Sequence, residues 1–186
     1  MHLTDQQTSL FEFVKRYHGE QKRKYTGAPY WTHLLSVAEI AGEYSSGAME
    51  VEIALCHDLI EDTAANYSDL EYELNNRGYN QAEIENMMTG VKDLTDVYVH
   101  EDYPSLNRQK RKALEATRLI ETSAHSQTVK YADVIDNTTS IVEHDEGFAR
   151  IYLREVTNYL YKLDRGNKQL YSRCVACVEN ALRDIR

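Results

Sequence analysis

Residues suited to metal and proton chemistry crowd together in residues 54–63. His57 and Asp58 are adjacent there, and Glu61 and Asp62 follow four positions later. On a helix, residues four apart lie on one face, so each member of the first pair would lie next to a member of the second. Leucine and isoleucine side chains between them favour burial, where like charges are costly without a compensating cation. The stretch therefore indicates half of a metal site, the alternative being a solvated acidic helix end.

Two further candidate ligands lie at a helix start or on a helix face that also carries apolar residues. His33 falls in the first turn of a predicted helix, and Asp133 lies on a later helix beside apolar residues. With His57 and Asp58 they make two imidazoles and two carboxylates. This donor set suits one divalent ion such as Mn, Fe, Co or Zn.

An ion held by these four residues would support hydrolysis of a phosphoester. It would lower the pKa of a bound water towards neutrality and polarise the phosphorus centre. Glu61 and Asp62 lie one turn from the proposed ligands. We expect them to orient the water and to move its proton.

The elements that carry these residues are all predicted to be helices. Two prolines and eight glycines are few, and the sequence shows no strand pattern, repeat or linker. Thr4 with Gln7 and Ser68 with Glu71 resemble capping boxes, and Thr32 is a third candidate N-cap. The expected helices are 4–18, 34–44, 49–62, 69–77, 81–94, 106–121, one through Asp133, 147–163 and 169–183. We predict an all-α, single-domain chain over residues 1–186.

Composition narrows the possible partners. The net charge of −9 argues against a general nucleic-acid binder, and no apolar run reaches the length of a membrane span. The N-terminus shows no signal pattern, and three cysteines fit a reducing compartment, so we expect a cytoplasmic protein. Cys174 and Cys177 form a C-x-x-C without a second pair, and their spacing indicates a helical core stripe. The sequence favours no particular oligomeric state.

The predicted helix 106–121 begins with a cluster of basic residues. Arg108, Lys110, Arg111 and Lys112 lie in its first turns. They form either a solvated face or the basic rim of a phosphate pocket.

Three segments resemble the HD-domain metal-dependent phosphohydrolases, and among these the hydrolase domains of Rel/SpoT-type enzymes and the small alarmone hydrolases. They are residues 18–33 (HGEQKRKYTGAPYWTH), residues 54–63 (ALCHDLIEDT) and residues 130–137 (KYADVIDN). The order and separation of these segments are similar to the family's over about residues 8–145, with helices 147–183 following.

The resemblance implies an HD-type helical bundle that removes the 3′-diphosphate of ppGpp or pppGpp, usually with manganese. It implies that His33, His57, Asp58 and Asp133 hold the metal and that Glu61 and Asp62 activate the water. It places Asn137 and Ser140 near the substrate and either Arg23 or Lys24 against the guanine base. The chain after about residue 147 is too short for a synthetase domain, so we expect a hydrolase alone.

The sequence departs from the family pattern at three positions. Leu34 stands where the family usually has proline. Val134 stands where it typically has arginine or lysine, and Asp136 where it often has histidine. We expect the latter two to leave the proposed ligands untouched and to alter the substrate side of the pocket. One alternative is therefore an HD phosphohydrolase for another nucleotide, such as a nucleoside triphosphate or an NADPH-like phosphate. A non-catalytic metal-binding module is a second alternative, which the presence of Glu61 and Asp62 disfavours.

Overall fold

A computed structural model describes residues 2–185, which fold into ten α-helices and no strand. The helices are α1 (Asp5–His18), α2 (Trp31–Gly42), α3 (Glu50–Cys56), α4 (Leu59–Asp62), α5 (Tyr67–Asn76), α6 (Gln81–Leu94), α7 (Arg108–Ile120), α8 (Ala124–His144), α9 (Glu146–Leu160) and α10 (Lys168–Asp184). The prediction of an all-α fold is confirmed. No helix in this part of the chain combines the length and hydropathy that crossing a membrane requires.

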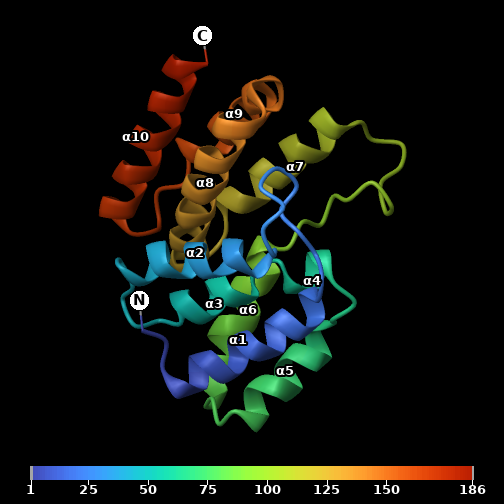
Figure 1. The fold of residues 1–186 in the computed structure, drawn as a ribbon, viewed down its shortest axis with the longest axis vertical. Coiled ribbons are helices and arrows are strands. Elements are labelled where there is room, and N and C mark those ends of the chain that lie inside the picture. Colours follow the sequence, from blue (N-terminus) through green and yellow to red (C-terminus); the bar gives the residue numbers. More distant parts are fainter. Residues whose placement is uncertain (1, 186) are drawn as a thin grey trace.

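Helices α2, α3 and α8 pack against one another at the centre of the molecule. Helices α1, α5 and α6 lie on one side of this centre, and α7, α9 and α10 lie on the other (Figure 1). Helices α2 and α8 carry His33 and Asp133, and His57 and Asp58 directly follow α3, so the packing of the core also positions the site.

The apolar stripes of the helices meet in one hydrophobic core. It includes Leu10 and Phe13 of α1, Val37 of α2 and Leu153 of α9, each at most 2% exposed. Burial of each such side chain contributes roughly 1.5–3 kcal/mol. Cys174 belongs to this core and Cys177 packs against it from the same helix, as the predicted core stripe requires.

Helices α3 and α6 approach closely because α6 carries a glycine at the contact. A Cβ atom on Gly90 would lie 2.5 Å from the Cδ1 atom of Ile53, which is fully buried. Because neither side has room for a methyl group, this contact fixes how closely α6 can hold α3, the helix that leads into the metal site.

The prediction of one continuous helix over residues 49–62 is wrong at His57 and Asp58. Helix α3 ends before His57, and Asp58 has φ −98° and ψ 0°, after which α4 begins. In a continuous helix, successive side chains are turned by about 100° from each other. The break allows two adjacent residues to face the same point, which regular helical geometry does not.

Two of the predicted caps are also wrong. Helix α2 begins at Trp31, and the Thr32 hydroxyl donates to the Pro29 carbonyl instead of accepting a backbone N–H. The capping box of α5 uses Asn66 with Asp69, because the Asn66 side chain accepts the orphan N–H groups of the first turn. The capping box predicted for Thr4 and Gln7 is confirmed.

Candidate metal centre

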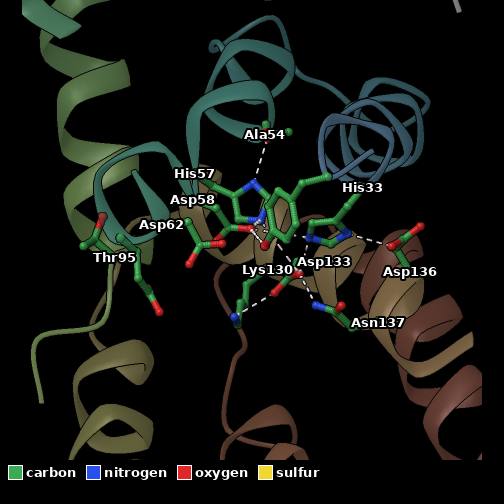
Figure 2. Close-up of polar contacts among 12 residues, drawn as sticks. His33, Ala54, His57, Asp58, Asp62, Thr95, Lys130, Asp133, Asp136 and Asn137 are labelled. Carbon is green, nitrogen blue, oxygen red and sulfur yellow. Dashed lines mark hydrogen bonds and ion pairs between the residues drawn. The ribbon is translucent and has the colours of Figure 1, made fainter. Parts of the chain in front are cut away.

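The structure brings His33, His57, Asp58 and Asp133 together at the junction of α2, α3 and α8 (Figure 2). Nε2 of His33 lies 3.6 Å from Oδ2 of Asp58 and 3.3 Å from Oδ1 of Asp133. Nε2 of His57 lies 3.1 Å and 3.8 Å from the same two oxygens. The donors therefore converge from both sides on one small volume.

The orientation of the His57 imidazole fits that of a metal ligand. Its Nδ1 atom donates to the backbone carbonyl of Ala54 at 2.7 Å, which leaves Nε2 as the nitrogen that faces the cluster. This Nε2 atom is buried, and it makes no hydrogen bond within residues 2–185. An unsatisfied buried nitrogen is costly in a native fold, and coordination of a cation would satisfy it.

The electrostatics of the cluster favour a cation. Burial lowers the pKa of His33, but hydrogen bonds with Asp133 and Asp136 outweigh it and raise the pKa to about 10. Burial opposes ionisation of Asp58 and Asp133, but their partners outweigh it. His57 holds the pKa of Asp58 below its usual range, and Lys130, followed by the hydrogen bond with His33, does the same for Asp133. Two ionised carboxylates and two imidazoles in a buried site match the donor set of a divalent transition metal.

Three further side chains hold the carboxylates in place. The Tyr30 hydroxyl donates to Oδ2 of Asp58 at 2.7 Å. Lys130 donates to Oδ2 of Asp133 at 2.8 Å, and the Asn137 amide donates to Oδ1 of the same residue at 2.6 Å. No role for Tyr30 or Lys130 was predicted from the sequence. Lys130 lies three residues before Asp133 on α8, which was a usable signal. Tyr30 contacts Asp58, 28 residues away, so its spacing gave no such signal.

Glu61 and Asp62 lie on α4, outside the cluster of four donors. Glu61 accepts a hydrogen bond from the backbone N–H of Asp96 at 2.9 Å, and Asp62 accepts one from the Gln21 side chain at 3.1 Å. Glu61 is accessible to solvent, and partial desolvation together with the Asp96 carboxylate raises its pKa to about 7. A carboxylate with that pKa can exchange protons near neutral pH.

The four predicted substrate residues line a single cavity next to His33, which we call the loop cavity. Its volume is about 150 Å³, and its walls include Arg23, Lys24, Asn137 and Ser140. Tyr25, Tyr30 and Ile141 give it apolar walls. Flat apolar walls with a few cations and one amide suit a nucleobase or sugar more than a bare phosphate.

A second cavity, the α9 cavity, lies on the other side of Asn137. It has a volume of about 140 Å³ and is lined by Arg108, Lys112, Lys130, Asp133 and Asn137, among others. Two cations of the predicted basic cluster therefore line the same cavity as the proposed ligand Asp133. Each is paired with a carboxylate: Arg108 binds Glu155 through two hydrogen bonds of 2.8 Å, and Lys112 binds Asp96 at 2.5 Å.

The two departures at positions 134 and 136 have different consequences. The expectation for Val134 was wrong, because this residue is fully buried in the core and lines neither cavity. Asp136 contacts both His33 and Arg23, so the expectation that it leaves the proposed ligands untouched was wrong.

Comparison with known proteins agrees with this arrangement. A family model described as an HD domain matches residues 11–162. The guanosine-3′,5′-bis(diphosphate) 3′-pyrophosphohydrolase of Aquifex aeolicus is 42% identical over 67 residues, which is 36% of this chain. A probable enzyme of the same name from Mycoplasma pneumoniae is 31% identical over 140 residues, or 72% of this chain. The MESH1 pyrophosphohydrolase of Drosophila melanogaster is 28% identical over 123 residues, 64% of this chain and 60% of its own length.

The fold is also that of a solved structure. A metazoan orthologue of SpoT, which hydrolyses ppGpp, superposes with a TM-score of 0.78 at 21% identity, over 99% of this chain and 97% of the other. The matched segments span only 10% and 18% of the two bacterial relatives.

Proposed function

Because the chain belongs to the HD-domain family, we propose that it is a metal-dependent phosphohydrolase that removes the 3′-diphosphate of ppGpp or pppGpp. The observation that carries the proposal is the position of the metal centre, between the loop cavity and the α9 cavity. A nucleotide placed with its base in the first cavity would bring a phosphate to the buried donors. The named relatives, which are pyrophosphohydrolases of guanosine bis(diphosphate), support the choice of substrate.

We assign His33, His57, Asp58 and Asp133 as ligands of one divalent ion, with manganese as the native metal. Such an ion would polarise a phosphoryl oxygen and make a water more acidic. Tyr30 and Lys130 keep Asp58 and Asp133 in orientation through their hydrogen bonds. This support matters because ligand orientation strongly affects metal affinity.

Glu61 and Asp62 are assigned to proton transfer. Water attacks the phosphorus attached to the ribose 3′ oxygen, and the bond between that phosphorus and the oxygen breaks. Glu61 accepts the proton of the attacking water, which its pKa of about 7 permits near neutrality. Asp62, held by Gln21, orients this water. The proton that Glu61 accepted passes to the 3′ oxygen, and the products are GDP or GTP and pyrophosphate.

Arg23, Lys24, Asn137 and Ser140 are assigned to substrate binding because they line the loop cavity together. Arg23 already forms an ion pair with Asp136 at 2.6 Å. Lys24 lies over the rings of Tyr25 and Phe148, at 5.0 Å and 5.4 Å. We therefore assign Lys24 as the cation that meets the base.

One observation favours a second candidate, hydrolysis of another phosphorylated nucleotide. The cations of the α9 cavity are paired with Glu155, Asp96 and Asp133, so this cavity carries little net positive charge. A substrate with fewer phosphates than ppGpp would need to displace fewer of these pairs.

The test is release of pyrophosphate and of orthophosphate by the purified protein with Mn²⁺. The substrates are ppGpp and pppGpp, beside GTP, ATP and NADPH, with EDTA as the control. Turnover of the two alarmones alone is the expected result. Turnover of another substrate alone would establish the second candidate, and a protein that hydrolyses none of them would refute both.

A further inference from the structure

Asp136 lies just behind the proposed metal centre and joins it to the loop between α1 and α2. One oxygen of its carboxylate, Oδ2, lies 2.7 Å from Nδ1 of His33 and 2.6 Å from the guanidinium of Arg23. The side chain of His33 is 3% exposed, that of Asp136 11% and that of Arg23 15%. The contact among them is therefore shielded from water.

The chemistry of this contact fixes the orientation of His33. A carboxylate can only accept a hydrogen bond, so Nδ1 of His33 donates. The lone pair that binds a metal then lies on Nε2, which points toward Asp58 and Asp133. If the ring were turned over, Nδ1 would lose this acceptor and carbon atoms would replace the ligand nitrogen. His57 is fixed in the same way, but by the backbone carbonyl of Ala54.

The spacing along α8 places two carboxylates on the same imidazole. Asp133 and Asp136 lie three residues apart, and residues three apart share a helix face. Asp133 faces Nε2 of His33, whereas Asp136 faces Nδ1. One turn of α8 therefore supplies both a ligand of the proposed metal and the partner that orients another ligand.

The ion pair with Arg23 extends this arrangement into the loop cavity. The loop is closed by the backbone pairs from Arg23 to Ala28 and from Tyr30 to Gln21, and it carries Lys24 and Tyr25. Arg23 attaches this loop to α8 through Asp136. The position of the cavity wall is thus coupled to the orientation of a metal ligand.

We propose that Asp136 is a positioning residue that fixes the imidazole of His33 for metal binding and anchors the substrate loop through Arg23. The inference rests on the metal site of the proposed function.

The test measures Mn²⁺ affinity without any nucleotide. Titration followed by the electron paramagnetic resonance signal of unbound Mn²⁺ gives a dissociation constant for each variant. Asp136→Ala should weaken binding about 10- to 100-fold, the usual effect of removing a ligand's hydrogen-bond partner. Asp136→Asn should weaken it less, because the amide oxygen still accepts from Nδ1. Glu143→Ala removes an exposed carboxylate from the same helix and should leave affinity unchanged.

Arg23→Gln separates the two parts of the role. It keeps the contact between Asp136 and His33, so Mn²⁺ affinity should remain close to wild type while KM for the hydrolysed nucleotide rises. Far-UV circular dichroism and thermal unfolding in EDTA establish that each variant is folded. Wild-type Mn²⁺ affinity in folded Asp136→Ala would overturn the inference and leave the proposed function standing. If folded Asp136→Ala binds Mn²⁺ more weakly but the wild-type protein hydrolyses no nucleotide, the inference stands and the proposed function is refuted.

Discussion

Glu61 is predicted to favour catalysis at the expense of stability, and Glu61→Gln tests both. The amide has the same shape as the carboxylate and can still accept from the backbone N–H of Asp96. It cannot take a proton from water, so turnover should fall by about 100-fold or more. It also cannot ionise, so it removes an unfavourable charge from the folded protein.

The size of the stability gain follows from the pKa of Glu61. Folding raises this pKa from 4.5 to about 7. The folded state therefore resists deprotonation, and stability is lost as pH rises from about 4.5 to 7 and stays lost above it. Full burial would make the penalty ~3 kcal/mol, and because Glu61 is accessible to solvent we discount it to ~1 kcal/mol. A protein of this size gains ~2–4 °C in Tm per kcal/mol.

The assay compares thermal unfolding of the wild type and Glu61→Gln in EDTA at pH 8 and at pH 5. The variant should melt ~2–4 °C higher at pH 8, and the gain should shrink at pH 5. Glu71→Gln, which removes the same charge from an exposed position on α5, should change neither Tm nor turnover. A variant that melts lower at pH 8 would show that the charged carboxylate stabilises the fold, and undiminished turnover would remove Glu61 from the proton transfer. Either result refutes the reasoning.

Three further predictions concern the metal centre and the core. His33, with a pKa of about 10, is protonated at pH 8 in the metal-free protein, so Mn²⁺ binding should release at least one proton and tighten as pH rises. Calorimetry in two buffers of different ionisation enthalpy measures the proton release. Equal heats of binding in the two buffers would contradict the prediction. Asp58→Ala should abolish stoichiometric Mn²⁺ binding and turnover together. Equilibrium dialysis measures the binding, and the pyrophosphate assay measures the turnover. A variant that still binds one Mn²⁺ would show that Asp58 is not a ligand. Gly90→Ala places a methyl group 2.5 Å from Ile53 and should lower the free energy of unfolding in urea by ~1–3 kcal/mol. Ile53→Val should partly restore it. An unchanged urea midpoint would show that α3 and α6 can separate.

Helical periodicity predicted the elements well because most of the core is built from regular amphipathic helices. Helix α6 begins and ends where the pattern indicates, with Asn80 as its cap. The errors lie where a side chain makes a non-local or competing hydrogen bond. Thr32 donates to Pro29, and so it does not cap α2. Residue propensity alone cannot show which of two such bonds a hydroxyl forms.

The candidate site was predictable to the extent that it depends on residue type. Carboxylates and imidazoles beside apolar residues indicated His33, His57, Asp58 and Asp133. In the structure each imidazole Nε2 lies within 4 Å of an oxygen of both carboxylates. The supporting contacts that join distant segments were not predictable, unlike the local contacts of Lys130 and Asn137 with Asp133 on α8. Arg23 and Asp136 are 113 residues apart, and only the packing of the loop on α8 shows that they meet.

The break between α3 and α4 explains how one short motif supplies two kinds of residue. In an unbroken helix, His57 would share a face with Glu61, and the proposed base would compete for the same position as the ligand. With the helix ended at Cys56, His57 and Asp58 both turn toward His33 of α2. Glu61 instead contacts the backbone after α6. A segment of ten residues can therefore provide both metal ligands and a separate proton acceptor, because its helical register is interrupted between them.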